Sequence, residues 1–188
     1  MKIVLSTNNP GKKLEIGQVF AGSPIEILSL ADVGIVGEAK EDGTTLFQNA
    51  LKKALFAWEP GRWVMADDTG IYIDALNEKP GVDTADWNGG NTDTEKKTLW
   101  ILNQLKDIKN RSARFVTVAT IISPEGKRDS FLGEVHGKIL EASRCKPQNK
   151  MPYGPIFLPD GCEKVFAEMT VEEENQISHR GKAFKKAL

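Results

Sequence analysis

Two adjacent carboxylates, Asp67 and Asp68, follow a short apolar run at 63–66 and precede Thr69 and Gly70. An apolar run of this length predicts a buried strand, and ligand sites on open α/β sheets lie at the carboxyl ends of strands. Because neighbouring strand residues point to opposite faces, one carboxylate should face a reaction centre while the other binds the scaffold. The alternative is a solvated turn, for which Asp-Asp-Thr-Gly is an ordinary composition.

A turn of small polar residues, Thr7-Asn8-Asn9-Pro10-Gly11-Lys12, joins the first predicted strand to a helix. Backbone N–H groups at a helix N-terminus, together with one cation, suit an anion such as phosphate. The spacing is not that of a Walker A loop, which reads G-x-x-x-x-G-K-[ST]. On its spacing alone, the turn is only a weak indication of a phosphate site.

Further charged residues fit the same chemistry. Glu41 and Asp68 could share a divalent cation, Lys53 projects from a predicted helix, and Ser178-His179-Arg180 interrupts the C-terminal helix. Mg²⁺ takes one or two carboxylates plus substrate phosphate oxygens, and Lys and Arg neutralise phosphate charge. The set therefore predicts a metal-assisted phosphate site. Taken singly, each residue has a plainer explanation, because a lone Lys is usually solvated and a lone His usually structural.

The elements that must position these residues alternate between strands and helices and end in a hairpin. Strands are predicted at 2–6, 26–30, 63–66, 71–73, 113–123 and 130–137, and helices at 12–21, 46–58, 92–106 and from about 170 to 188. Capping boxes are expected at Thr92 with Glu95 and at Thr170 with Glu173. Alternating elements followed by a hairpin predict a mixed sheet.

Apolar periodicity also predicts which helix residues face inward. These are Leu14, Val19 and Phe20 in the first helix, Leu99, Leu102 and Leu105 in the third, and a stripe of Leu46, Phe47, Ala50, Leu51, Ala54, Leu55 and Trp58 in the second. Lys53 is expected to lie off the middle of that stripe.

Composition limits the class of protein. The chain has 188 residues, 40% hydrophobic and 27% charged, with a net charge of -1, which predicts one domain over residues 1–188 and no bulk attraction to nucleic acid or anionic membrane. Cys145 and Cys162 lack metal-ligand spacing and are expected to be free thiols. No apolar run approaches membrane-spanning length, and the N-terminus reads as a strand, so a cytoplasmic location is expected.

Several motifs in fixed order resemble the inosine triphosphate pyrophosphatase family, the Ham1/RdgB-like non-canonical purine nucleoside triphosphate pyrophosphatases. The matching stretches are 6–12, 41–50 with 53–54, 66–70, 80–82, 113–115, 133–137, 153–161, 166–170 and 177–183. The resemblance covers nearly the whole chain. It implies an α/β fold with a long curved mixed β-sheet, flanking helices and two lobes around a central cleft, in a cytoplasmic homodimer that uses Mg²⁺.

The resemblance also implies a role for each matching site residue. The triphosphate is expected on Thr7, Asn8, Asn9, Gly11 and Lys12, Mg²⁺ on Glu41 and Asp68, and the purine on Tyr153, Gly154, Glu174, Ser178, His179 and Arg180, with Thr69 touching substrate beside Asp68. Asp68 is the expected base for water, and Lys53 is expected to neutralise phosphate. In this family water cleaves the α–β bond of a nucleoside triphosphate, giving the monophosphate and pyrophosphate, and a positioned carboxylate beside metal and cations suits that chemistry.

The base-recognition end departs from the family pattern. The family usually reads Gly-Phe-Gly-Tyr-Asp-Pro where this chain has residues 150–155, so that Met151 replaces a stacking Phe and Gly154 replaces an Asp. Glu174 replaces a Lys, and residues 83–86 replace Tyr-Ser-Ala-Arg. An ionised Glu only accepts hydrogen bonds where Lys donates them, which favours a base that presents donors. Drift in an enzyme that still cleaves inosine or xanthosine triphosphates explains the same changes.

Two other functions compete with the pyrophosphatase reading. One is a nucleotide-binding or sensor protein that has lost catalysis, and a weaker one is a general phosphatase. Glu41, Lys53 and Asp68 favour catalysis, because a binding protein has no need of a carboxylate that activates water.

Overall fold

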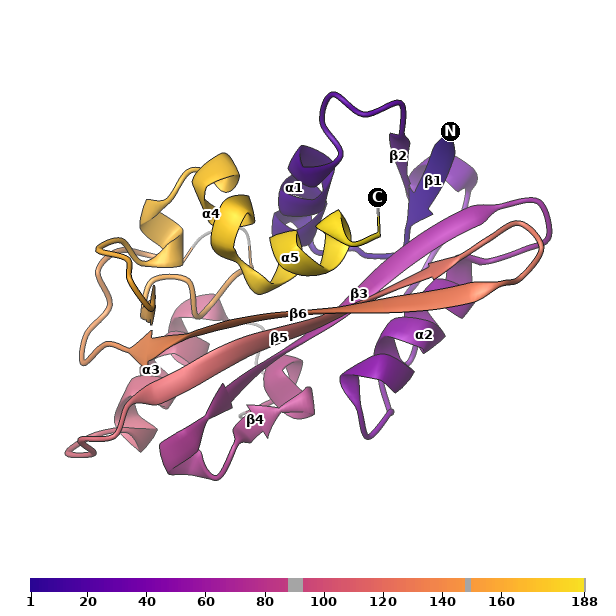
Figure 1. The fold of residues 1–188 in the computed structure, drawn as a ribbon. Coiled ribbons are helices and arrows are strands. Elements are labelled where there is room, and N and C mark those ends of the chain that lie inside the picture. The colour runs from indigo at the N-terminus through magenta and orange to yellow at the C-terminus, as the bar shows by residue number, and fades with distance from the viewer. Residues whose placement is uncertain (88–92, 148–149, 188) are drawn as a thin grey trace.

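The computed structural model describes residues 1–87, 93–147 and 150–187. Its strands are β1 (Lys2–Leu5), β2 (Glu26–Ser29), β3 (Trp63–Ile73), β4 (Lys79–Gly81), β5 (Ser112–Ile122), β6 (Arg128–Ile139) and β7 (Phe157–Pro159). Within the described residues these seven strands form one sheet in the order β2-β1-β3-β5-β6-β7, with β4 paired to β3 (Figure 1). β1 runs parallel to β2 and β3, and the other pairs are antiparallel. The predicted mixed sheet and its β5–β6 hairpin are therefore confirmed.

The helices lie between and beside these strands. They are α1 (Pro10–Val19), α2 (Leu46–Ala57), α3 (Thr94–Gln104), α4 (Val171–Ile177) and α5 (His179–Lys185), with short 3₁₀ turns at Ala31–Val33, Asp74–Leu76, Val82–Ala85 and Phe166–Glu168. None of the helices in the described parts of the chain has the length and apolar character needed to cross a membrane.

The central strand β3 differs from the prediction. The sequence predicts two short strands, at 63–66 and 71–73, separated by a turn at 67–70, but the structure has one continuous strand. β5 pairs with β3 in register from Val64 to Ile73, so every turn-forming residue is held extended by a neighbour distant in sequence. Asp67 and Asp68 consequently lie in the middle of a strand, not at its carboxyl end.

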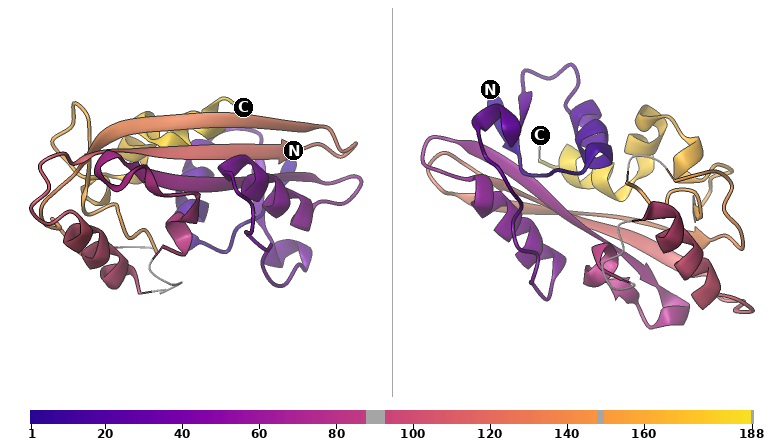
Figure 2. Two further views of the ribbon diagram at one scale, coloured as in Figure 1. Left: turned by 90° about the horizontal axis from the view of Figure 1, so that it is seen from below. Right: turned by 180° about the vertical axis from the view of Figure 1, so that it is seen from behind.

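Alternation along β3 sends its side chains into two separate cores. Met65 packs with Ile16 of α1 and Phe184 of α5, whereas Val64 and Ala66 pack with α2. Figures 1 and 2 show α1, α4 and α5 on one side of the long strands and α2 on the other. Because side chains on a strand alternate, residues adjacent in sequence serve different faces.

The structure corrects one position in each of two predicted helix faces. In α1, Leu14 is 51% exposed while Ile16 is fully buried, and in α3 Leu99 is 57% exposed while Ile101 and Leu105 are buried. The first helix begins at Pro10, not at residue 12, because the side chain of Asn9 caps it. Leu14 and Leu99 therefore do not face inward, whereas Phe20 and Leu105 are buried and Val19 and Leu102 pack against the core, as predicted.

The N-terminus of α3 lies close to residues that the structure does not describe. Asp93 is the N-cap, and its side chain accepts from the backbone N–H groups of Glu95 and Lys96. The predicted capping box would use Thr92, which lies outside the described residues. The second predicted capping box, Thr170 with Glu173, is present at the start of α4.

The second helix also carries a corrected position. Lys53, expected off the apolar stripe, is only 8% exposed, while Phe47, expected within it, is 51% exposed. The buried face of α2 therefore includes a cation. A buried Lys needs compensating charge from nearby acids.

The C-terminal segment breaks at Ser178, as the sequence indicates. Ser178 ends α4 and caps α5, and its side chain accepts from the backbone N–H of Gly181 at 3.0 Å. α5 then packs closely on β6, where an added Cβ at Gly133 would lie 1.9 Å from the backbone oxygen of His179 and 2.6 Å from the backbone nitrogen of Ala183. This close contact fixes the position of α5 over the sheet.

Replacing Gly133 with Ala is therefore expected to destabilise the protein by about 1–3 kcal/mol or more, because the methyl group pushes α5 away from the sheet. The measurement is the free energy of unfolding from urea denaturation. Gly17→Ala is the matched control, because a Cβ at Gly17 has nothing within 4 Å and Ala is favoured over Gly in a helix interior. Equal stabilities for the two variants would contradict the close contact.

Candidate active site

The sheet separates the two adjacent carboxylates. Asp67 lies on the α1 and α5 side of β3 and is 1% exposed, and Asp68 lies on the α2 side. The expectation that the two face opposite ways, from strand alternation, is therefore confirmed by their partners. Each carboxylate has its own set of cations.

Asp68 belongs to a compact cluster with Lys53 and Glu41. The Lys53 ammonium nitrogen lies 2.7 Å from Oδ1 of Asp68 and 2.8 Å from Oε2 of Glu41. Burial raises the pKa of Asp68, with the positive charge of Lys53 acting in the opposite direction. Burial works against the charge on Lys53, but Asp68, Asp67 and Glu41 outweigh it and raise the pKa of the ammonium group. Lys53 therefore stays protonated between the two acids.

The same cluster offers oxygen ligands to a hard cation. Oδ2 of Asp68 is buried and has no hydrogen-bond partner among the described residues, while Oδ1 is held by Lys53. Glu41 reaches the same ammonium group from the loop before α2, so the two carboxylates converge. Residues 1–87, 93–147 and 150–187 hold no group of three His, Cys, Asp or Glu placed to form a metal centre. Two carboxylates nevertheless fit Mg²⁺, which takes its other ligands from phosphate and water.

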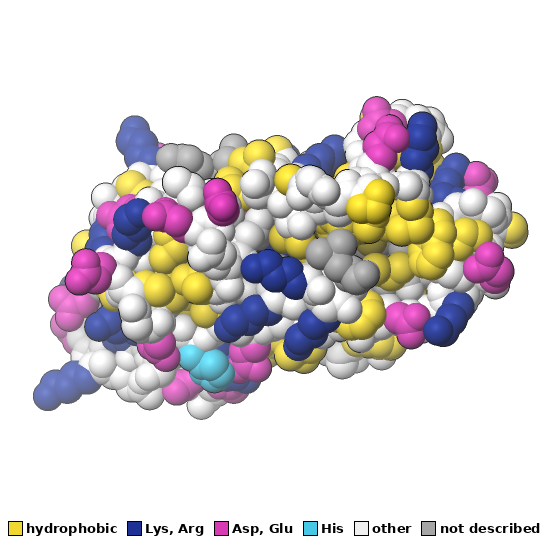
Figure 3. Space-filling view, turned by 45° about the horizontal axis from the view of Figure 1, so that its top comes forward, with side chains coloured by type: hydrophobic (Ala, Val, Ile, Leu, Met, Phe, Trp, Pro, Cys, Tyr) yellow, Lys and Arg dark blue, Asp and Glu magenta, His cyan; other side chains and the backbone are white. Residues whose placement is uncertain are grey.

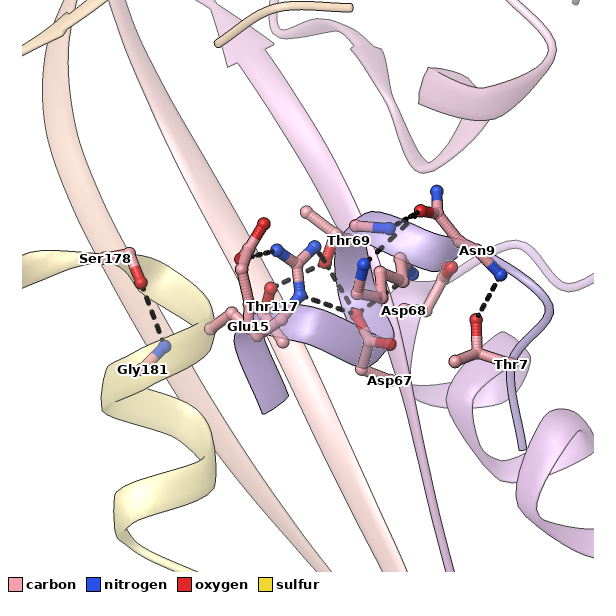
Figure 4. Close-up of polar contacts among 12 residues, drawn as sticks. Thr7, Asn9, Glu15, Asp67, Asp68, Thr69, Thr117, Ser178 and Gly181 are labelled. Atoms are coloured by element: carbon pink, nitrogen blue, oxygen red, sulfur yellow. Dashed lines mark hydrogen bonds and ion pairs between the residues drawn. The ribbon is translucent and has the colours of Figure 1, made fainter. Parts of the chain in front are cut away.

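Asp67 is bound into a buried ion network on the opposite face. Its Oδ2 lies 3.0 Å from the Lys12 ammonium group and 3.4 Å from Nε of Arg180, and it accepts from the Thr69 hydroxyl at 3.0 Å. Arg180 also binds Glu15 of α1, and Figure 4 draws this network. Burial alone would raise the pKa of Asp67, but Lys12 and Arg180 outweigh it and hold that pKa below its usual range. Asp67 thus joins α1, β3 and α5.

Sequence reasoning did not identify Glu15 as part of the site. It sits in α1 without a motif, yet it is buried beneath Arg180, and only its distant partner on α5 explains its position. Arg180 is correspondingly 1% exposed, and burial works against its charge while Glu15 and Asp67 raise its pKa. No local sequence signal could have paired these two residues.

The polar turn before α1 is organised by its own side chains. Oδ1 of Asn9 accepts from the backbone N–H groups of Gly11 at 2.9 Å and Lys12 at 3.3 Å, and the backbone N–H of Asn9 donates to the Thr7 hydroxyl at 3.2 Å. The side-chain amide of Asn8 donates to the Gly37 carbonyl at 3.1 Å and so holds the loop that leads to Glu41. Burial lowers the pKa of Lys12, partly offset by Asp67.

One edge of β3 is open beside this turn. β1 pairs with β3 only at Trp63–Met65 and β4 only at Ile71–Ile73, so between them this edge has no strand partner within the described residues. The backbone N–H of Ser6 donates to the Met65 carbonyl at 2.8 Å. This contact places the polar turn at the start of the unpaired part of the β3 edge. A ligand that passes this edge can contact groups on both faces of the sheet.

A cavity of about 470 Å³ lies on the Asp67 side of the sheet. Its lining runs from the polar turn to the C-terminal helices: it includes Asn8, Asn9, Gly11, Lys12, Thr69, Met151, Pro152, Tyr153, Gly154, Glu174, His179 and Arg180. Most of the predicted substrate-binding residues thus share one cavity. Thr7, Glu41, Lys53, Asp68 and Ser178 are not part of its lining, and the first four lie toward the open edge and the α2 face.

The far end of the cavity has flat apolar walls. The His179 ring stacks on Phe115 with centroids 4.7 Å apart and an angle of 13°, and Phe166 lies beside it at 5.9 Å. Burial, followed by the nearby Arg180, lowers the pKa of His179 well below its usual value, so the imidazole is neutral. Tyr153 is buried and donates to the Thr84 carbonyl at 3.3 Å. These rings form a surface suited to another planar ring.

Gly154 and Glu174 also line this cavity. A Cβ at Gly154 would meet Ala167 only at 3.5 Å, an ordinary contact, so the position has room for a side chain. Burial and the charge of Glu15 raise the pKa of Glu174 to about 8, with Arg180 acting in the opposite direction. The expectation of a base that presents hydrogen-bond donors requires an ionised Glu174. With a pKa of about 8, this carboxyl group is mostly protonated at neutral pH.

Comparison with known proteins agrees with this arrangement. The sequence model of the Ham1 family matches residues 3–188. This chain belongs to the Ham1 family. It is 41% identical to a dITP/XTP pyrophosphatase of Thermoanaerobacter pseudethanolicus over 99% of this chain and 94% of the relative, and 39% identical to one of Thermus thermophilus over 100% and 90%. The Ham1 protein of Coxiella burnetii superposes with a TM-score of 0.85 at 30% identity, over 100% of this chain and 96% of that one.

The Ham1 fold confirms the expected architecture of a curved mixed sheet with flanking helices. Its cavity is lined from the polar turn before α1 to the C-terminal helices. Both cysteines are free, as expected. The Ser178 hydroxyl caps α5 and Arg180 is held by Glu15 and Asp67, so both maintain the cavity wall from within. Their contact with a purine stays a prediction.

Proposed function

We propose that this chain, as one domain over residues 1–188, hydrolyses nucleoside triphosphates to the monophosphate and pyrophosphate, with dITP, ITP and XTP as substrates and Mg²⁺ as cofactor. The relatives named dITP/XTP pyrophosphatases support the reaction, since they match at about 40% identity over nearly the full chain. One structural observation carries the proposal: a Lys held between two carboxylates lies on one face of β3, and a cavity lined in part by aromatic rings lies on the other.

The open edge of β3 joins these two parts. A nucleotide with its base at the aromatic end of the cavity has its sugar and first phosphate near Lys12, Asn9 and Thr69, and its phosphate chain can pass the edge toward Lys53. Lys12 and Lys53 then neutralise phosphate charge from the two faces of the sheet. The α–β bond comes to lie near the edge, beside Asp68.

Glu41 and Asp68 are the residues that would hold Mg²⁺, with the unpartnered Oδ2 of Asp68 as one ligand atom. When bound, the ion would offset the charge of the phosphate oxygens and of the leaving pyrophosphate. Asp68 accepts the proton of the attacking water, and Lys53 keeps this carboxylate oriented through its 2.7 Å contact. The sheet and the buried Lys53 keep the reacting carboxylate in place.

An assay of pyrophosphate release tests the function. We expect turnover of ITP, dITP and XTP with Mg²⁺, no turnover after chelation, and pyrophosphate as the direct product. Direct release of orthophosphate would favour a general phosphatase. Tight triphosphate binding in calorimetry without any turnover would favour a nucleotide-binding or sensor protein.

The proposal includes a homodimer in the cytoplasm that binds neither nucleic acid polymers nor membranes. An exposed apolar groove on the α2 side supports a second copy as partner: it is lined by Leu46, Phe47, Tyr72, Val82, Val116, Val118 and Leu132 with two Thr residues. Figure 3 shows one face on which Lys and Arg lie among Asp and Glu toward both ends, with further Lys and Arg side chains near its middle. Light scattering that gives a monomer mass at micromolar concentration would contradict the dimer.

A further inference from the structure

Glu174 is an acidic side chain on the wall of the cavity. It lies on α4, one helical turn before Ser178, and it lines the cavity together with Glu15, His179 and Arg180. No ion pair or side-chain hydrogen bond satisfies its carboxyl group within residues 1–87, 93–147 and 150–187. A cavity-lining acid without a partner is therefore available to a ligand.

The charges around Glu174 do not neutralise it. From α1 it faces Glu15, a like charge, and from α5 it faces Arg180, whose guanidinium already binds Glu15 and Asp67. The remaining ionisable groups on the described cavity wall are Lys12, Glu38, Lys97, Lys150, Tyr153 and His179. On α4 itself, Glu172 is exposed, and Glu173 is exposed and pairs with Lys164.

Lys12 does not change this balance, because its ammonium group is bound to Asp67 at 3.0 Å. Burial and the neighbouring Glu15 both favour the uncharged form of Glu174, and its pKa is raised to about 8. At neutral pH most molecules therefore carry a proton on this side chain. A protonated carboxyl group has an O–H donor, which an ionised one lacks.

We propose that Glu174 reads the base as a protonated carboxyl group, donating a hydrogen bond to a carbonyl oxygen of a 6-oxopurine. This inference rests on the proposed function and adds the chemistry that selects the substrate. An acid at this position then serves the same class of base that a Lys donor would serve, because both present N–H or O–H to an oxo group. Loss of the proton at alkaline pH converts the donor into an acceptor, which suits an exocyclic amino group instead.

The expected result is a selectivity that depends on pH. The ratio of kcat/KM for ITP to kcat/KM for ATP should fall by up to about tenfold from pH 7 to pH 9, because the protonated fraction of a group with a pKa of about 8 falls about tenfold over that range. The N1–H of inosine also ionises in alkali, so the wild-type profile alone does not isolate the enzyme group.

Glu174→Gln separates the two ionisations. Gln keeps a permanent N–H donor and does not titrate, so the variant should prefer ITP at pH 7 and should lose the enzyme's part of the pH dependence while keeping that of the substrate. Glu172→Gln is the matched control, since Glu172 is exposed on the same helix, and it should follow the wild-type profile. Identical profiles for wild type and Glu174→Gln would overturn the proposal, as would a uniform loss of activity on both nucleotides with the ratio unchanged.

Binding of the monophosphates tests the same inference without catalysis. The ratio of the Kd values for AMP and IMP, measured by calorimetry, should fall from pH 7 to pH 9 in wild type and less in Glu174→Gln. Failure of the enzyme to cleave any triphosphate would refute the proposed function, but this binding ratio would still decide the role of Glu174. A ratio that does not differ between the two proteins would refute that role even in an active enzyme.

Discussion

Replacing Asp68 with Asn is expected to lower kcat by about 10²–10⁴-fold, the range usually supplied by a positioned general base. Asn keeps the shape of the side chain and can still accept from Lys53, which lies 2.7 Å from Oδ1, so the local structure should survive. What is lost is the negative charge and the basicity of the second oxygen, which has no protein partner within the described residues. The measurement is steady-state turnover of ITP with Mg²⁺, alongside circular dichroism and thermal unfolding.

Asp129→Asn is the control, because Asp129 is an exposed carboxylate at the start of β6 and its loss should leave activity within about twofold. Retention of more than about a tenth of wild-type turnover in Asp68→Asn would contradict the general-base role.

Asp67→Asn should have a different effect from Asp68→Asn. Since Asp67 binds Lys12 and Arg180, its replacement should reduce stability first, and it should affect chemistry only through the position of Lys12.

Arg180→Met is expected to destabilise the protein by about 3–5 kcal/mol, the usual cost of removing one partner of a buried ion pair. The change leaves Glu15 buried without its guanidinium partner, and Asp67 keeps Lys12 and the Thr69 hydroxyl. Met has similar length, so lost packing contributes little. The measurement is the urea midpoint with an unchanged m-value, which reports stability and not compactness.

Lys185→Met is the matched control, because Lys185 is an exposed cation on the same helix and its loss should change stability by no more than about 0.5 kcal/mol. Adding Glu15→Leu to Arg180→Met should recover part of the lost stability, because the uncompensated carboxylate is then removed. A loss below about 1 kcal/mol in Arg180→Met would show that the network contributes little to the folded state.

Local chemistry in the sequence determined several features of the fold. Strand alternation placed Asp67 and Asp68 on opposite faces because the period of two belongs to any extended chain, whatever pairs with it. The capping box of Thr170 with Glu173, the break at Ser178 and the β5–β6 hairpin are likewise set by residues within a few positions of one another. The ordered motifs also identify the family from the sequence alone.

Only the tertiary structure decided which residues lie together at the site. The continuity of β3 through Asp67 to Gly70 depends on pairing with β5, which overrides the turn preference of those residues. The burial of Lys53 on α2 depends on Asp68 and Glu41 meeting it from other segments. Such contacts join positions far apart in the chain, so periodicity and spacing carry no signal of them.

The protonation of Glu174 is the clearest case of this limit. From the sequence it is an acid in place of a Lys, which predicts an acceptor at the base. In the fold, α1 brings Glu15 against α4 and the cavity wall removes water, and both effects raise its pKa to about 8. The sequence determined the residue type, but its raised pKa comes from burial in the fold and from Glu15, which the fold brings near it.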